Sequence, residues 1–290
     1  MSLTYTLAAT AALSCFFIAS AQDLKSREVD DVMWIASGTA GLVLSAYALI
    51  TADAGSFLPV FTIAFPAFLF ADMFADWERL RGKTGTMLRY TGGSICALST
   101  FASAYAFSST IVVDAVAAGS LWILFIFLLF HLDVIKGGAD AKALVCLVLL
   151  YPEYPQPVLG HVLPAYASFT FPFFINTLLL AAVISLAIPL LLLFRNAAKG
   201  DAVLPFMFLG YRKNLDDVVL EKEWLIQYPT DDGTPVRLKK LGSFDDGQML
   251  ESARTAGWKT IWVSPKIPFI VPLTIGLIFT LMFGNVLLYF

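Results

Sequence analysis

The sequence predicts an all-α polytopic membrane protein with about eight transmembrane helices and a small cytoplasmic α+β subdomain before the last helix. Of its 290 residues, 58% are hydrophobic and 14% are charged, whereas a soluble domain has about 25% charged residues. Several apolar runs reach the roughly 20 residues that a helix needs to cross a bilayer core of about 30 Å. One charge-rich segment separates the last apolar run from the others.

Eight apolar segments fit the full or partial length of a transmembrane helix. The fourth is rich in Ser, Thr and Gly, and the sixth is short enough to be a broken or half-length span. The first ends in Ala-Ser-Ala, which resembles a signal-peptidase site, but no Lys or Arg precedes it, so we expect an uncleaved span. The segments are residues 3–21, 32–51, 56–73, 91–107, 112–131, 139–151, 168–194 and 268–289.

The distribution of Lys and Arg predicts the orientation of these spans. Basic residues concentrate on the cytoplasmic side of membrane proteins. If the N-terminus lies outside, every Lys and Arg falls in a cytoplasmic segment or at its helix ends, and the outer loops contain none. We therefore expect a multi-pass protein of the cell membrane with both termini outside. The outer loops are then residues 52–55, 108–111 and 152–167.

The region before the last apolar run differs in kind from the rest of the chain. It mixes charges with short apolar runs, and the Asp-Gly pair within residues 230–234 favours a hairpin. The Val-Arg-Leu run that follows alternates as a strand does, and residues 246–256 fit a short helix. The expected domains are a membrane bundle at 1–196, a cytoplasmic subdomain at 197–265 and a C-terminal transmembrane helix at 266–290.

Two acids stand at the cytoplasmic ends of predicted spans. Ionisable residues within membrane segments are costly, so Asp23 and Asp140 are candidates for function. Bundle sites use side chains from different helices. Two carboxyls about 3 Å apart share one proton and supply an acid and a base without a metal. Such a pair can hydrolyse a peptide bond, and the domain at 1–196 carries both members.

Structural explanations for these acids remain open. Asp23 could simply end a span in the headgroup region, and Asp140 could belong to an interfacial ion-pair cluster with neighbouring lysines. Asp114 lies near the outer end of its span and could not join a cytoplasmic pair. Several other acids could join one, so the residues alone do not select a single pair. These rivals are Asp72, Asp76 and Asp133.

Two glycines precede Asp140. Gly137 and Gly138 lack Cβ atoms, so they permit unusual backbone angles and the close approach of another chain. Irregular backbone at membrane depth is tolerated where protein shields it or where it faces water, and hydrolysis needs water. We expect both glycines, with Ala139 and Lys142, to shape the backbone or contact substrate. A plain turn or tight helix packing is the competing explanation.

The sequence gives little support for metal, cofactor or nucleic-acid binding. Three cysteines lie inside apolar runs without metal-binding spacing, and two histidines lie far apart, so we expect no metal and no cofactor. No basic stripe with interleaved aromatic residues indicates nucleic-acid binding. Nothing in the sequence indicates an oligomeric state. The residues concerned are Cys15, Cys96, Cys146, His131 and His161.

Four stretches resemble a known family. Residues 137–144, G-G-A-D-A-K-A-L, resemble the second aspartate motif of type IV prepilin peptidases and archaeal preflagellin peptidases, which are GxGD-type intramembrane aspartyl proteases. Residues 23–34 resemble the first motif, and residues 208–214 and 265–272 resemble the archaeal branch. The resemblance implies that Asp23 and Asp140 are catalytic. The sequence departs from the wider superfamily at Ala139, where Gly is commoner. It also lacks the cysteine-rich module of long bacterial members, so the resemblance does not imply N-methyltransferase activity.

The resemblance also implies a substrate. Family members remove a short basic leader from preflagellin or prepilin-like precursors, and they cut at the cytoplasmic boundary of the precursor's apolar helix. We expect such precursors and membrane lipid as partners, and no nucleic acid. Acidic residues at 28, 30, 31, 216 and 217 could attract the basic leader.

Three other functions are compatible with parts of the sequence. A presenilin-like protease would have Tyr before the first aspartate, where this chain has Gln22, and a Pro-Ala-Leu motif that is missing. An ion- or proton-coupled transporter would also use membrane aspartates. The acids here cluster at one face, and no inverted repeat is evident. A structural membrane subunit without chemistry is the third alternative.

Overall fold

The computed structural model describes residues 3–52, 57–75, 82–108, 110–135, 137–155, 158–159, 171–201, 203–229, 235–237 and 246–285. The chain divides into two compact units. Unit 1 consists of Met1–Ala181 and Phe269–Phe290, and unit 2 consists of Ala182–Pro268.

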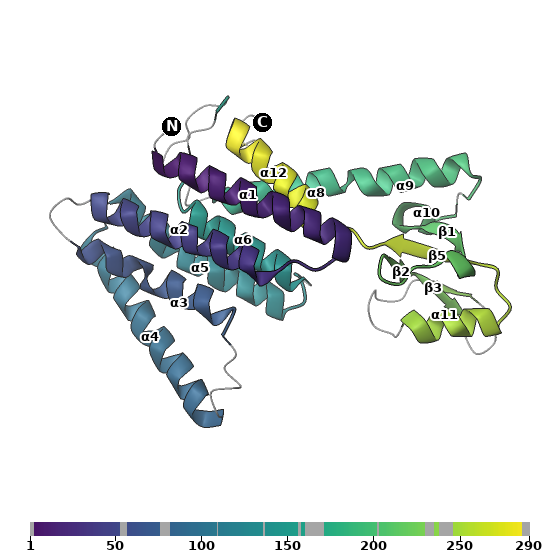
Figure 1. The fold of residues 1–290 in the computed structure, drawn as a ribbon, viewed down its shortest axis with the longest axis horizontal. Coiled ribbons are helices and arrows are strands. Elements are labelled where there is room, and N and C mark those ends of the chain that lie inside the picture. Colours follow the sequence, from purple (N-terminus) through teal and green to yellow (C-terminus); the bar gives the residue numbers. More distant parts are fainter. Residues whose placement is uncertain are drawn as a thin grey trace. The chain divides into compact units, whose positions relative to one another are not determined.

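Unit 1 is helical, and each of the eight expected apolar segments contains helix (Figure 1). Helices α1, α2 and α5, and α8 taken together with α9 (Ala187–Ala198), are long and apolar enough to cross a membrane. The predicted mostly helical class, with several apolar helices, is therefore confirmed. The helices of unit 1 are α1 (Leu3–Ser26), α2 (Asp31–Ala52), η1 (Leu58–Ile63), α3 (Ala64–Asp72), α4 (Gly82–Ala106), α5 (Ile111–His131), α6 (Gly138–Leu150), α8 (Phe173–Ser185) and α12 (Ile270–Phe283).

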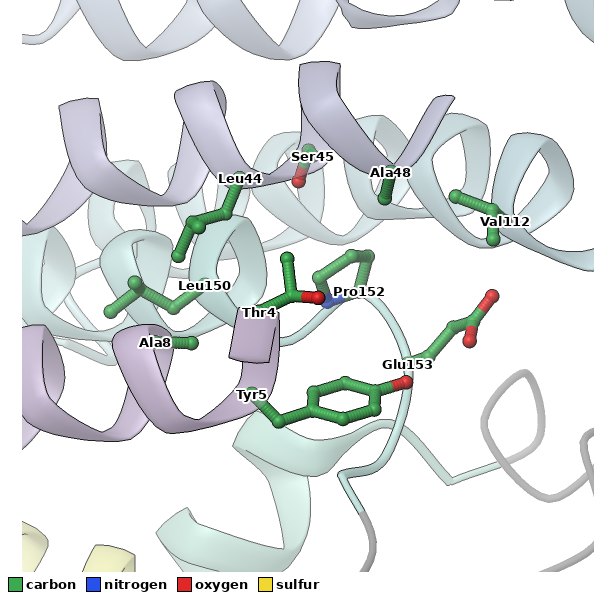
Figure 2. Close-up of a pocket in the computed structure, with 10 residues that line it drawn as sticks. All are labelled: Thr4, Tyr5, Ala8, Leu44, Ser45, Ala48, Val112, Leu150, Pro152 and Glu153. Atoms are coloured by element: carbon green, nitrogen blue, oxygen red, sulfur yellow. The ribbon is translucent and has the colours of Figure 1, made fainter. Parts of the chain in front are cut away.

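A cavity of about 130 Å³ lies in unit 1 where α6 ends. Figure 2 shows apolar side chains of α1, α2 and α6 around it, with Tyr5 beside Glu153. Burial raises the pKa of the Glu153 carboxyl, and a hydrogen bond from the Tyr5 hydroxyl partly offsets that rise. Leu150 and Pro152 also line the cavity, so it lies at the opposite end of α6 from Asp140.

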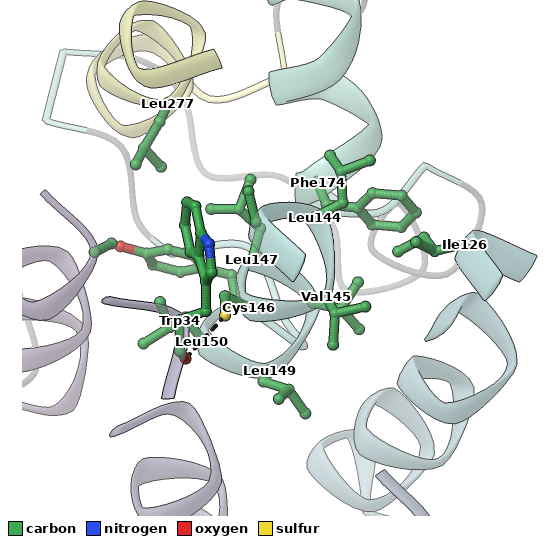
Figure 3. Close-up of a cluster of buried hydrophobic side chains, with 14 of the residues drawn as sticks. Trp34, Ile126, Leu144, Val145, Cys146, Leu147, Leu149, Leu150, Phe174 and Leu277 are labelled. Atoms are coloured by element: carbon green, nitrogen blue, oxygen red, sulfur yellow. Dashed lines mark hydrogen bonds between the residues drawn. The ribbon is translucent and has the colours of Figure 1, made fainter. Parts of the chain in front are cut away.

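Helix α6 forms the centre of unit 1. It has 13 residues, as the short sixth segment predicted, and it packs against α1, α2 and α5. Its side chains from Ala143 to Leu150 are all buried, and Figure 3 shows several of them with Trp34, Phe174 and Leu277 around them. A helix that is apolar on every side belongs in a core. This packing fixes the position of the first turn of α6, which carries Asp140.

Unit 2 starts within α8 and includes α9, where we expected the membrane bundle to continue to residue 196. An antiparallel sheet in the order β1-β5-β2 forms its centre, with Tyr211 and Leu225 on either side of Val263. The sheet and α11 bury a small apolar core. The elements are α10 (Phe206–Leu209), β1 (Tyr211–Asn214), η2 (Leu215–Asp217), β2 (Glu223–Leu225), α11 (Asp246–Thr255) and β5 (Thr260–Pro265).

Two expectations for this region are confirmed. Strands β3 (Gln227–Pro229) and β4 (Pro235–Arg237) pair antiparallel, as expected for a hairpin, although its turn at 230–234 lies outside the described residues. Helix α11 matches the predicted helix at 246–256.

Glu223 is a buried carboxylate within unit 2. Its side chain accepts hydrogen bonds from Lys213 Nζ at 2.8 and 2.9 Å, from the Val219 amide at 3.1 Å and from the Tyr211 hydroxyl. Burial alone would raise the pKa of Glu223, but these donors, Lys213 first, bring it below its usual range. Burial and the carboxylate raise the pKa of Tyr211 to about 12. Glu223 thus joins β2 to β1.

Candidate active site

Asp23 lies near the end of α1 and is buried, with 9% of its surface exposed. Its Oδ2 atom accepts a hydrogen bond of 3.2 Å from the backbone amide of Ile270, the first residue of α12. The N-terminus of a helix carries a partial positive charge, which favours a carboxylate there. Since α12 has no acidic residue in its first turn, Asp23 supplies the negative charge from another helix.

Two hydroxyl groups hold α1 against α12 one turn away from Asp23. Ser20 Oγ and Thr274 Oγ1 are 2.8 Å apart, and both residues are buried. Thr274 also donates to the carbonyl oxygen of Ile270 at 2.8 Å and lies 3.3 Å from that of Phe16. This contact fixes the register between the two helices, and therefore the distance from the Ile270 amide to Asp23.

The turn that follows Asp23 is also ordered by hydrogen bonds. Arg27 has a positive φ of 62°, and its backbone amide donates to the carbonyl oxygen of Asp23 at 3.2 Å. Its guanidinium lies 3.4 Å from the same oxygen, which places a positive charge near the Asp23 carboxylate. Gln22 bonds to the side chain and the backbone of Asp30, at 2.7 and 3.1 Å.

Asp140 occupies the first turn of α6. Gly137 precedes this helix in an extended conformation, with φ −87° and ψ 122°. The Asp140 carboxyl folds back over Gly137, so a Cβ atom at residue 137 would lie 2.3 Å from Asp140 Oδ2. A Cβ atom at Gly138 would meet nothing within 4 Å. Of the two expected backbone-shaping glycines, Gly137 is therefore the one that makes room for the carboxyl.

The structure brings the two aspartates together. Helices α1 and α6 are in contact, and the negative charge of Asp23 acts on Asp140. Among the described residues, no donor forms a hydrogen bond with the Asp140 carboxyl. Two carboxyls that are close enough to interact strongly titrate as a coupled pair. The arrangement therefore has the chemical means for combined acid and base action.

The other two predicted residues have structural contacts. Lys142 forms an ion pair of 2.5 Å with Asp31, the first residue of α2, and its ammonium lies 4.9 Å from the centre of the Phe74 ring. The ion pair ties α6 to α2 just after Asp140. Ala139 is half-buried and packs against the core of unit 1.

The rival acids are placed differently. Arg89 engages Asp72 through two hydrogen bonds of 2.8 and 2.5 Å. Asp133 follows α5 and is exposed, with a positive φ of 56°. Asp114 lies in the first turn of α5, and Asp76 falls outside the described residues. Within the described part of the chain, no group of three or more His, Cys, Asp or Glu residues could hold a metal ion.

Sequence reasoning missed the groups that position Asp23, namely the Ile270 amide, Ser20 and Thr274. A backbone amide has no sequence signature. Ser20 offered a faint one, because a residue three positions before Asp23 lies on the same face of a helix. Its partner Thr274 is far away in sequence, so only the packing of α1 on α12 reveals the pair.

Comparisons with known proteins show a likeness to one group of peptidases. Residues 202–286, which include β1 to β5 and α12, match the family model Archaeal Peptidase A24 C-terminus Type II. The preflagellin peptidase of Methanococcus voltae is 24% identical over 278 residues, which are 93% of this chain and 92% of that protein. That of Methanocaldococcus jannaschii is 24% identical over 276 residues, 92% of this chain and 90% of that protein.

A third relative agrees with these two. The preflagellin peptidase of Methanococcus maripaludis is 24% identical over 283 residues, which are 94% of this chain and 93% of that protein. The likeness extends over nearly the whole length of each protein. The chain is therefore similar to archaeal preflagellin peptidases over nearly its whole length.

Proposed function

We propose that this protein is an intramembrane aspartyl endopeptidase. It removes the short basic leader of preflagellin, or of prepilin-like precursors, at the cytoplasmic face of the cell membrane. The observation that carries the proposal is the contact of α1 with α6, which brings Asp23 into electrostatic range of Asp140, a half-buried acid on a separate helix. Relatives that bear the name preflagellin peptidase support the substrate.

The proposed reaction uses one aspartate as base and the other as acid. The ionised carboxylate takes a proton from a water molecule, and the water oxygen bonds to the carbonyl carbon of the peptide. The protonated carboxyl donates a hydrogen bond and then its proton to the carbonyl oxygen. Collapse of the tetrahedral intermediate breaks the C–N bond, and a proton moves to the leaving amine. The Gly137 backbone and the first turn of α6 orient the Asp140 carboxyl for these transfers.

The proposal includes eight membrane spans with both termini outside. The positions of the helices and the distribution of Lys and Arg support it. Helix α6 is the shortest span: 13 residues extend about 20 Å. Asp140, at its start, then lies near the cytoplasmic surface, where the leader of a precursor ends.

Acidic residues offer places for the basic leader. In unit 1, Asp31 is already paired with Lys142, whereas Glu28 is exposed on the turn after α1. In unit 2, Asp216 and Asp217 are exposed on η2 beside a cleft of about 420 Å³. We assign these three exposed acids to attraction of the leader and not to chemistry.

Cleavage of a preflagellin-type substrate in membranes tests the function. We expect the wild type to release the leader, Asp23→Asn and Asp140→Asn to be inactive, and metal chelators to have no effect. Asp133→Asn, at an exposed acid directly after α5, is the matched control and should remain active. An inactive wild type that instead conducts ions, with the same two aspartates required, would favour the transporter alternative.

A further inference from the structure

We infer that the first turn of α12 keeps Asp23 ionised, so that Asp23 is the base of the pair and Asp140 is the acid, and that Thr274 is the positioning residue for this arrangement. The inference rests on the proposed function and divides the two roles, which that proposal leaves unassigned.

The hydrogen-bond partners of the two carboxyls differ. Asp23 Oδ2 accepts the Ile270 amide at 3.2 Å, and a donor to a carboxylate favours its charged form. Pro272 has no N–H, so the start of α12 offers an anion one amide fewer than an ordinary helix start does. The Asp23 carboxylate therefore accepts a hydrogen bond from one of the few backbone amides that are free at this helix end.

The charged groups around the pair also favour an ionised Asp23. Arg27, at the end of α1, places a guanidinium near Asp23, and α12 brings no titratable group in its first turn. From α6, Asp140 faces Asp23, while Lys142 is neutralised by Asp31 of α2. Burial disfavours a charge on either carboxyl, and among the described residues Arg27 favours the charge on Asp23.

Asp140 has weaker support for a negative charge. The N-terminus of α6 favours an anion, but no donor among the described residues bonds to the Asp140 carboxyl, and Asp23 repels its charge. When two interacting carboxyls share one proton, the proton stays on the group whose anion is less well stabilised. In this pair that group is Asp140.

Thr274 controls the stabilisation of Asp23 without touching it. Its hydroxyl bonds to Ser20 on α1 and to the Ile270 carbonyl on α12, so it fixes the helix turn that carries the donating amide. Loss of this hydroxyl should let the first turn of α12 move away from Asp23. Further along α12, Gly276 packs against the Thr177 backbone on α8, which keeps the helix in place.

The pH dependence of cleavage by the full chain in membranes tests the inference. Thr274→Val should lower kcat roughly 5- to 20-fold with KM unchanged, because the variant weakens a hydrogen bond to a charged group. It should also move the low-pH limb of the rate profile to higher pH, since the base then takes up a proton more readily. Thr274→Ser restores the hydroxyl and should restore both properties.

Thr280→Val is the matched control on the same helix. The Thr280 hydroxyl is buried and bonds to Asn176 and Thr177 on α8, far along α12 from Asp23. This variant should be less stable, but the low-pH limb of its rate profile should stay at the wild-type position. Ser20→Ala removes the partner hydroxyl from α1 and should reproduce the limb shift even where Thr274→Val folds poorly.

Two results separate the inference from the proposed function. If the wild type cleaves but Thr274→Val and Ser20→Ala keep its low-pH limb, the role of α12 is wrong and the protease proposal stands. An equal shift of the low-pH limb in Thr280→Val would also overturn the inference, because the shift would then reflect a general loss of helix packing. Failure of the wild type to cleave any leader-bearing substrate would overturn both.

Discussion

The first turns of α6 and α12 both hold a carboxyl group, but they obtain it in different ways. Helix α6 carries its own acid, Asp140, which folds back over the neighbouring Gly137. Helix α12 has no acid in its first turn and binds Asp23 of α1, a residue 247 positions away. One carboxyl is therefore positioned by local sequence, and the other by the packing of two distant helices.

This difference separates the kinds of mutation that should damage each half of the site. The Asp140 half depends on the backbone and the empty space at one glycine. The Asp23 half depends on helix register, which Ser20 and Thr274 maintain. Glu223 in unit 2 provides a reference for a buried carboxylate that has a full set of donors and no part in the proposed chemistry.

Among changes that leave both aspartates in place, Gly137→Ala should have the largest effect. The added methyl group would overlap the Asp140 carboxyl and push it out of place. Because a misplacement of about 1 Å can cost on the order of 100-fold in rate, we expect a loss of that size in kcat, with expression and melting temperature close to wild type. The measurement is the steady-state rate of leader cleavage.

Gly138→Ala is the matched control for this change. The site of its methyl group is open, so we expect activity within a few-fold of the wild type. Equal losses in the two variants would show that the pair of glycines acts through general flexibility. That result would remove the special role of the space at Gly137.

A smaller effect, on stability, should follow Glu223→Gln. The change weakens a buried hydrogen-bonded ion pair with Lys213, which we expect to lower the stability of unit 2 by about 1–3 kcal/mol. Because the folded-state pKa of Glu223 is lowered, its contribution is present above the ordinary value of 4.5 and is lost as pH falls through the folded-state value.

Thermal melting followed by tryptophan fluorescence checks this prediction. The gap in Tm between wild type and Glu223→Gln should be widest near neutral pH and should narrow on acidification below about pH 4.5. Glu251→Gln removes an exposed pair with Arg254 and should leave Tm nearly unchanged. A gap that widens toward acid pH would contradict the assigned direction.

Much of the fold followed from the sequence because its causes are local. Apolar runs mark the helices, and the Asp-Gly pair lies between the two strands that form the predicted hairpin. The Gly137–Asp140 half of the site could be predicted for the same reason, because residues that lie three positions apart in one helix turn contact each other. Lys142 was singled out as well, although its contact with Asp31 depends on the packing of α6 on α2.

The other half of the site could not be predicted in this way. The donor to Asp23 is a backbone amide, and Ser20 and Thr274 look like ordinary small polar residues in apolar helices. Their roles arise only when α1 and α12 pack in one register. Sequence patterns constrain each helix separately and leave that register open, so neither the amide nor the hydroxyl pair could be found before the structure.

The central claim is that Asp23 and Asp140 act as one unit, and a double-mutant comparison of cleavage rates tests it most directly. Residues that act as a unit are strongly non-additive in their kinetic effects. Asp23→Asn, Asp140→Asn and the double variant should therefore all fall to about the same residual rate. Two single variants with partial activity whose losses multiply in the double variant would contradict the account, because independent groups and not a shared-proton pair would then carry the reaction.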